Sequence, residues 1–243
     1  YNSEEFIYHR LENLVSQSLG NQLEIIVIDS NSPQNESKVV KEFQLQHKNI
    51  KLLRTDERET VYQAWNRGIK MASGKFVTNA NTDDVLRNDA LERLSHTLES
   101  NPQYDLAYGD FYITNIPNQK FERHVRIGYS HKPDYDSSIM LSGCHMGPQP
   151  LWRKSLHDKY GYFDENLAAA GDYEFWCRLA SNGHRFIHIN DYLGLYLHNL
   201  DGICNSNLGR VQTEAAEVKK KYGNSFPAIP NTPLPTGYYY KKP

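Results

Sequence analysis

The sequence predicts an α/β fold, with a mostly parallel sheet flanked by helices and a smaller antiparallel portion. Short apolar, β-branched runs alternate with amphipathic helical stretches over the first part of the chain. Each run ends in polar turn residues, as buried parallel strands do. After Asp105 the pattern changes to longer strand-like segments, which indicate antiparallel pairing.

The first portion alternates helices and strands. Residue spacing predicts helices over 4–18, 36–47, 61–72 and 88–100, and strands over 23–28, 50–53 and 75–78. The third helix is stopped by Ser73-Gly74. An α/β sheet normally opens with a strand, whereas this chain opens directly on a helix. We therefore expect the first strand to be missing from this sequence, which would make it part of a longer chain.

The second portion has a different composition. Strands are predicted over 106–113, 121–127, 185–189 and 192–198, and helices over 154–160, 172–182 and 208–222. Residues 137–150 are rich in Gly, Met and Pro and predict a loop. The tail 227–243 is rich in Pro and Tyr and is expected to be an extended strap.

Charge and cysteine content exclude several classes of protein. The 243 residues hold 27 Lys+Arg and 29 Asp+Glu, so the strongly basic surface of a nucleic-acid binder is absent. No apolar run is long enough to span a membrane. Three distant cysteines form no CxxC pair, which argues against a zinc knuckle or a disulfide framework and favours a reducing, cytoplasmic location.

Two polar clusters follow predicted strands, at 29–32 (Asp-Ser-Asn-Ser) and 81–84 (Asn-Thr-Asp-Asp). Ligands of open α/β sheets bind at this edge, and carboxylates there can hold a divalent cation on a diphosphate. The alternative for Asp83 and Asp84 is that they cap the following helix. A third cluster places Asp172 at the start of a predicted helix, after the small residues 168–171. It can be a helix cap or a general base.

Together these clusters resemble the family 2 glycosyltransferases, which have the Rossmann-like GT-A fold. The similar segments occur in the family's order along nearly the whole chain. They are 1–7 (YNSEEFI), 24–32 (EIIVIDSNS), 61–69 (VYQAWNRGI) with 72–76 (ASGKF), 81–84 (NTDD, at the DxD position), 108–110 (YGD), 149–154 (QPLWRK), 161–165 (GYFDE) and Asp172. The resemblance implies a nucleotide-sugar-binding half over 1–104 and an acceptor-binding, catalytic half over 105–226.

The resemblance also implies roles for individual residues. Asp172 would deprotonate the acceptor hydroxyl in an inverting transfer. Asp83 would bind Mg²⁺ or Mn²⁺, and His198 is a second candidate metal ligand. Gln149 and Trp152 would lie on the acceptor side, although Trp65, Trp152 and Trp176 are each expected mainly in the core. The residues expected to bind the nucleotide-sugar are Tyr1, Asn2, Asp29, Asn66, Asn81, Thr82 and Asp83.

The expected partners are a nucleotide-diphosphate sugar, with UDP as the favoured nucleotide, and a glycan, lipid-linked or protein acceptor. The expected location is the cytoplasm, and a peripheral location at the inner face of the membrane is compatible with this chemistry. Three residues depart from the family pattern: Ser30, Asn81 and Gly171 each replace an acid. They keep open a second interpretation, a non-catalytic nucleotide-sugar or glycan-binding module. A nucleotidyltransferase is disfavoured because no Gly-rich, basic N-terminal loop is present.

Overall fold

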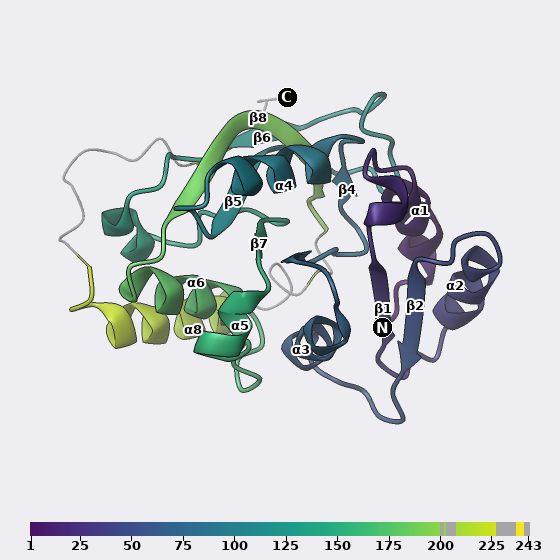
Figure 1. Cartoon of the computed structure of the whole chain (residues 1–243), viewed down its shortest axis with the longest axis horizontal. Helices are drawn as coiled ribbons and strands as arrows, with labels where there is room; N and C mark the ends of the chain where they lie inside the picture. The colour runs from purple at the N-terminus through teal and green to yellow at the C-terminus, as the bar shows by residue number, and fades with distance from the viewer. Residues whose placement is uncertain (200–201, 203–207, 227–236, 241–243) are drawn as a thin grey trace.

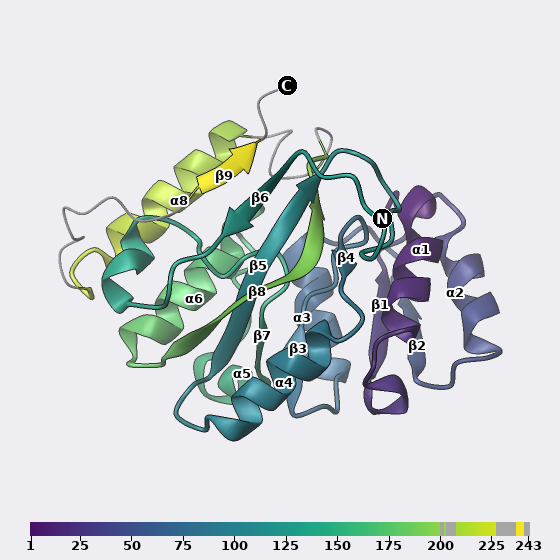
Figure 2. The same ribbon diagram turned by 90° about the horizontal axis from the view of Figure 1, so that it is seen from above.

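The strands form two sheets, one small and one large (Figure 1). The computed structural model describes residues 1–199, 202, 208–226 and 237–240. In the small sheet, β1 (Ile25–Asp29) pairs in parallel with β2 (Ile50–Arg54). Helices α1 (Glu4–Val15) and α2 (Glu36–Gln44) pack against each other beside this sheet (Figures 1 and 2).

The large sheet has the strand order β3-β7-β5-β6-β9, and β8 pairs with both β5 and β4. Figure 2 shows β5, β6 and β8 side by side. The strand bounds are β3 (Phe76–Thr78), β4 (Val85–Leu86), β5 (Leu106–Thr114), β6 (Gly128–His131), β7 (Leu151–Arg153), β8 (Phe186–Leu197) and β9 (Gly237–Tyr240).

The remaining helices cover the large sheet and the space between the two sheets. Helices α6 and α8 lie side by side, and α4 packs on β5, β7 and β8 (Figures 1 and 2). The bounds are α3 (Val61–Met71), α4 (Ala90–Ser100), α5 (Ser155–Tyr160), α6 (Gly171–Ser181) and α8 (Leu208–Tyr222), with short 3₁₀ turns at η1 (Gly20–Gln22) and η2 (Ser137–Leu141). A capping box between Thr60 and Gln63 starts α3.

The sheet is mixed rather than mostly parallel, because only β1–β2 and β5–β8 are parallel pairs among the described strands. The strand predicted over 121–127 is wrong, since pairing with β5 begins at Gly128. The strands predicted over 185–189 and 192–198 form one strand, β8, whose register shifts opposite Asp110 absorb the residues between them. The short strands β4 and β7 were not predicted, because two or three residues carry no periodicity.

The tail over 227–243 was predicted as a strap. Residues 227–236 and 241–243 lie outside the described part, while 237–240 form β9, which pairs antiparallel with β6. Trp152 and Trp176 are 1% exposed and confirm the expected core position. Trp65 is partly buried and packs edge-on against Tyr62 and Phe163.

Candidate active site

Residues of both sheets line a cavity of about 1970 Å³, which we term the central cavity. Its apolar part is lined by strand residues such as Ile26, Ile28 and Phe76. Its polar part gathers residues distant in sequence: Tyr1, Asn2, Ser30, Arg58, Asn81, Thr82, Asp83, Lys132, Cys144 and Asp172. The central cavity therefore brings together the N-terminal segment, the 81–84 cluster and Asp172.

Asp83 lies between β3 and β4 and lines the central cavity. Within the described residues, its carboxylate has no hydrogen bond or ion pair. An unengaged carboxylate at the wall of a polar cavity is suited to bind a hard divalent cation. It does not cap α4, because that helix begins at Ala90 after Asp89.

Asp84, by contrast, is buried and held by the protein. Its carboxylate accepts hydrogen bonds from the Asn81 amide at 3.1 Å and from the Leu197 N–H at 3.2 Å. Burial, followed by the charge of Asp83, raises the pKa of Asp84 to about 7, against the attraction of buried Arg10. Both acids line the central cavity, but they differ in their contacts: the Asp84 carboxylate is hydrogen-bonded within the protein, whereas that of Asp83 makes no hydrogen bond with the described residues.

The N-terminal segment is tied to the same region. The Asn2 N–H donates to Ser32 Oγ at 3.1 Å, and Thr82 Oγ1 donates to Ser3 Oγ at 3.2 Å. The guanidinium of Arg58 lies 4.1 Å from the centre of the Tyr1 ring. These contacts hold Tyr1, Asn2 and Thr82 at the cavity wall, and their role in binding the nucleotide-sugar stays a prediction.

Asp172 lies in the first turn of α6 and is partly buried. One oxygen accepts hydrogen bonds from the Tyr173 N–H at 2.8 Å and the Tyr62 hydroxyl at 3.2 Å, while the Cys144 thiol lies 4.0 Å from the other. Burial raises the pKa of Asp172, although the bonds from Tyr173 and Tyr62 favour its ionised form. A carboxylate with a raised pKa is a better proton acceptor.

Gly171 explains one departure from the family pattern. A Cβ at this position would lie 2.7 Å from the Tyr62 ring, too close for any side chain. The ring of Tyr62, 3% exposed, occupies the space beside the backbone of α6. Tyr62, whose hydroxyl contacts Asp172, therefore occupies the space that an acidic side chain at residue 171 would need.

The segment 168–170, immediately before Asp172, is anchored by a carboxylate of another helix. The carboxylate of Glu214, on α8, accepts the backbone N–H groups of Ala168, Ala169 and Ala170 at 2.8–3.1 Å. Burial opposes ionisation, but Arg210 and these N–H donors hold the pKa of Glu214 below its ordinary value. Glu214 thereby fixes the chain immediately before Asp172. Sequence reasoning missed it because α8 is distant in sequence.

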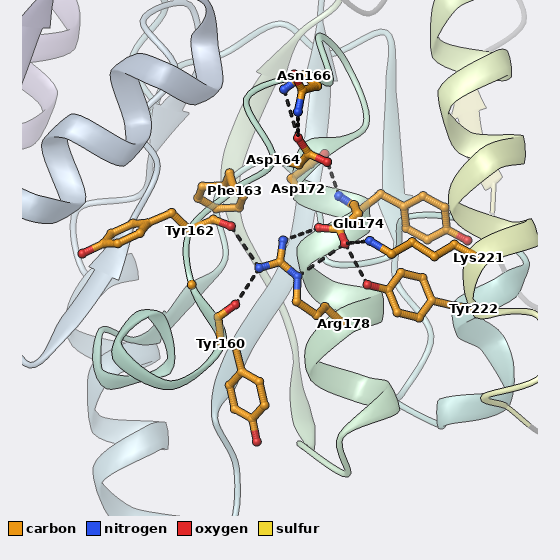
Figure 3. A network of polar contacts seen from close by, with 12 residues as sticks. Tyr160, Tyr162, Phe163, Asp164, Asn166, Asp172, Glu174, Arg178, Lys221 and Tyr222 are labelled. Atoms are coloured by element: carbon orange, nitrogen blue, oxygen red, sulfur yellow. Dashed lines mark hydrogen bonds and ion pairs between the residues drawn. The ribbon is translucent and has the colours of Figure 1, made fainter.

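A second network fixes α6 from below Asp172 (Figure 3). Glu174 is paired with Arg178 and accepts hydrogen bonds from Lys221 at 2.8 Å and the Tyr222 hydroxyl at 2.7 Å. Arg178 also donates to the carbonyls of Tyr160 and Tyr162. The network joins α6 to α8 and to the loop after α5, and the largely exposed Lys221 side chain contributes an ion pair with Glu174 to it.

Two predicted nucleotide-sugar residues do not line the central cavity. The Asp29 carboxylate, 1% exposed, is engaged by Arg54, Ser37 and the Ser32 N–H. Burial opposes this charge, but these donors hold the pKa of Asp29 below its ordinary value. Asn66 is buried and exchanges hydrogen bonds with the backbone of Phe163 at 2.9 and 3.0 Å. Both side chains stabilise loops, because their polar atoms are already paired within the protein.

Of the two residues predicted on the acceptor side, Trp152 lines the central cavity and Gln149 does not. Gln149 is buried and accepts a hydrogen bond from Arg10. The Trp152 indole N–H donates to His157 at 2.8 Å, and its ring packs edge-on against Trp176, so it offers no exposed platform to a sugar. His198 follows β8, and its N–H donates to the Thr114 carbonyl at 2.7 Å. Its neighbours Leu197 and Asn199 line the central cavity.

Comparisons with known proteins identify the family and the fold of the chain. A family model described as Glycosyl transferase family 2 matches residues 1–162. The chain belongs to this family. An uncharacterized glycosyltransferase of Methanocaldococcus jannaschii, MJ1057, is 23% identical over 193 residues, covering 79% of this chain and 66% of the relative.

Solved structures of glycosyltransferases show the same fold as this family 2 member. S. aureus TarS 1-349 in complex with UDP-GlcNAc has a TM-score of 0.70 at 19% identity, covering 90% of this chain and 64% of TarS. The mannosyltransferase PcManGT from Pyrobaculum calidifontis, in complex with GDP-Man and Mn²⁺, has a TM-score of 0.70 at 17% identity, covering 94% and 63%. The chain thus has the GT-A fold and spans under two thirds of these proteins.

Two residues that line the central cavity, Arg58 and Lys132, belong to no sequence motif and were not predicted. Arg58 and Lys132 bring cationic side chains to its wall. The ammonium of Lys132 lies 5.0 Å from the centre of the Phe111 ring, and burial lowers its pKa. Within the described residues, none of the helices combines the length and apolarity needed to cross a membrane.

Proposed function

We propose that this family 2 glycosyltransferase moves a sugar from a nucleotide-diphosphate donor to an acceptor hydroxyl, with metal dependence and inversion. The observation that carries the proposal is that Asp83 and Asp172, which are far apart in sequence, line one cavity. The Asp83 carboxylate makes no hydrogen bond or ion pair with the described residues, although it interacts electrostatically with Arg10 and Asp84, and burial raises the pKa of Asp172. A cation ligand and a proton acceptor are the two groups that such a transfer requires.

The donor in this proposal is a UDP-sugar. TarS with UDP-GlcNAc and PcManGT with GDP-Man share the fold, which supports a nucleotide-sugar in the corresponding cavity. The cavity wall offers an aromatic ring at Tyr1 and cationic side chains at Arg58 and Lys132. These groups can stack on a base and offset phosphate charge. Because Ser30 lines the cavity and Asp29 does not, we propose that the backbone around Ser30 contacts the nucleotide instead of Asp29.

Asp83 would hold Mg²⁺ or Mn²⁺. The residues fit such an ion, because Asp83 presents an unengaged hard oxygen donor and these ions are commonly held by one or two carboxylates plus substrate phosphates. The bound cation would offset charge on the departing diphosphate. The role of His198 as a further ligand stays a prediction, and His198→Ala tests it through the Mn²⁺ dependence of donor binding.

Asp172 would accept the proton of the acceptor hydroxyl, whose oxygen then attacks the anomeric carbon from the face opposite the diphosphate. Tyr62 and the N–H of Tyr173 orient the carboxylate. The acceptor is a glycan, a lipid-linked sugar or a protein, as part of polysaccharide biosynthesis in the cytoplasm. Hexosyl and N-acetylhexosaminyl groups are the sugars to test first.

The experiment combines two variants with a matched control. Asp172→Asn should bind UDP-GlcNAc with Mn²⁺ normally but lose transfer and donor hydrolysis, whereas Asp83→Asn should lose Mn²⁺-dependent donor binding. Asp158→Asn, on the exposed side of α5, should match the unmodified protein. Full transfer by Asp172→Asn would refute its role as the base.

A non-catalytic nucleotide-sugar or glycan-binding module is the second candidate. It is favoured by Asn81, whose amide is bonded to Asp84 and replaces an acid of the DxD motif. Calorimetric binding of UDP-GlcNAc without transfer or hydrolysis, over a panel of acceptors, would support this module and refute the enzyme.

A further inference from the structure

A cluster of metal-ligating side chains lies outside the central cavity. Asp110 on β5, His131 on β6 and His188 on β8 each offer one ligand atom, and these atoms lie within 4.8 Å of one another. His131 Nδ1 is 2.6 Å from Asp110 Oδ2, and His188 Nε2 is 2.8 Å from Asp110 Oδ1. None of the three lines the central cavity, whereas the neighbours Phe111 and Lys132 do.

The strands bring these residues together by their pairing. β5 lies between β6 on one edge and β8 on the other, so Asp110 stands in the middle of the three strands. Tyr108, two residues before Asp110, stacks on the His188 ring with centroids 5.2 Å apart. Side chains two residues apart share one face of a strand. The cluster therefore belongs to the face of β5 that carries Tyr108.

Neighbouring groups hydrogen-bond to Asp110 and His188 and fix their orientation, as the residues around the ligands of a metal site do. Asp134 Oδ1 lies 3.1 Å from His188 Nδ1, which leaves Nε2 directed at Asp110. The Lys132 N–H donates to Asp110 Oδ1 at 2.7 Å. In metal sites a ligating histidine usually donates its second ring nitrogen to a carboxylate, which fixes its orientation. Asp110 and His188 have side chains 1% and 2% exposed, while His131 is 39% exposed and gives access from solvent.

We propose that Asp110, His131 and His188 form a site for Zn²⁺ or a similar first-row divalent ion, separate from the cation site at Asp83. Two imidazoles and one carboxylate suit Zn²⁺ better than Mg²⁺, which prefers oxygen ligands throughout. Tetrahedral coordination needs ligand atoms roughly 3.4 Å apart, so a small outward movement of half-exposed His131 would admit the ion. The ion would connect β5, β6 and β8, and the fourth position would be open to solvent.

Co²⁺ provides the test, because it replaces Zn²⁺ and its visible absorption reports the geometry. Tag-free protein is titrated with Co²⁺ at neutral pH without nucleotide. We expect it to bind one equivalent of Co²⁺ with the intense visible absorption of tetrahedral coordination, and Zn²⁺ to displace the Co²⁺ and abolish that absorption. His131→Ala should lose this spectrum. Because His131 is exposed, this variant should fold, which circular dichroism checks. Asp134→Asn should weaken Zn²⁺ binding by about 10- to 100-fold.

Two controls separate this site from other histidines and from the Asp83 site. His124→Ala removes a histidine that stacks on Tyr112 nearby but offers no ligand to the cluster, and should leave the spectrum unchanged. Asp83→Asn should also leave it unchanged. An unmodified protein without a tetrahedral Co²⁺ spectrum, or a spectrum that persists in His131→Ala, would overturn the proposal. The result does not depend on transferase activity.

Discussion

The Tyr62 hydroxyl donates a hydrogen bond to the Asp172 carboxylate at 3.2 Å, and the Tyr62 ring fills the space beside Gly171. One side chain of α3 thus positions the first turn of α6 in two ways. Its hydroxyl favours the ionised carboxylate, and its ring excludes a side chain at residue 171. The nucleotide-sugar half and the catalytic half of the predicted organisation meet at this contact.

Tyr62→Phe removes the hydrogen bond while keeping the ring. We expect kcat for transfer to fall about tenfold, the size expected for a hydrogen bond to a charged group. Since the bond lowers the pKa of Asp172, its loss should move the acidic limb of the kcat profile to higher pH. Steady-state rates over a pH series measure both effects. Tyr8→Phe, at an exposed tyrosine, is the control. An unchanged pH profile would show that the contact does not act on Asp172.

Gly171→Ala places a methyl group against the Tyr62 ring. We expect the free energy of unfolding to fall by about 1–3 kcal/mol, as in other overpacked cores. Urea denaturation measures the loss. In the Tyr62→Ala background the same substitution should cost much less, because the ring that it meets is gone. Equal costs in both backgrounds would argue against the steric explanation.

Glu214→Gln weakens the acceptor that binds the N–H groups of Ala168, Ala169 and Ala170. We expect a loss of roughly 2 kcal/mol in unfolding free energy, together with a lower kcat. The pKa of Glu214 is lowered in the folded protein, so its ionised form stabilises the fold above the unfolded pKa. The difference between the two proteins should therefore shrink as the pH falls through the folded pKa. Glu217→Gln, exposed on the same helix, is the matched control.

Asp84→Asn tests the buried acid beside Arg10. The folded pKa of Asp84, about 7, lies above the unfolded value, so its contribution to stability is full below about pH 4 and is lost as the pH rises to 7. The unmodified protein should lose roughly 3 kcal/mol relative to Asp84→Asn over this range. Urea midpoints at several pH values measure the difference. A constant difference would mean that Asp84 does not titrate there.

The sequence indicated which polar residues lie at the ends of strands and helices, but not which of their side chains line the central cavity. Asp83, which follows β3, and Asp172, at the start of α6, both line the central cavity. Asp29 ends β1 in the other sheet, and its carboxylate pairs with Arg54 on the neighbouring strand. Its pairing depends on the Asp29–Arg54 register, which no local pattern reveals.

The helices were predicted well because their apolar spacing is local, as in α3 and α8. The short strands β4 and β7 depend on partners far along the chain. Glu214 illustrates the same limit within the site, since its role becomes visible only when α8 packs beside α6. Gly171 differs from Glu214, because the sequence already showed it as a departure from the family pattern. The structure adds the physical reason, since the Tyr62 ring leaves no room for a side chain at residue 171.

Among the described strands, β1 pairs only with β2 and β3 only with β7, so each leaves one edge without a partner strand. Residues of both strands line the apolar part of the central cavity. Unpaired edges with apolar side chains are templates for strand addition and for aggregation. We therefore expect copies of the chain to associate through these edges at high concentration, and an extended apolar peptide added in solution to reduce that association.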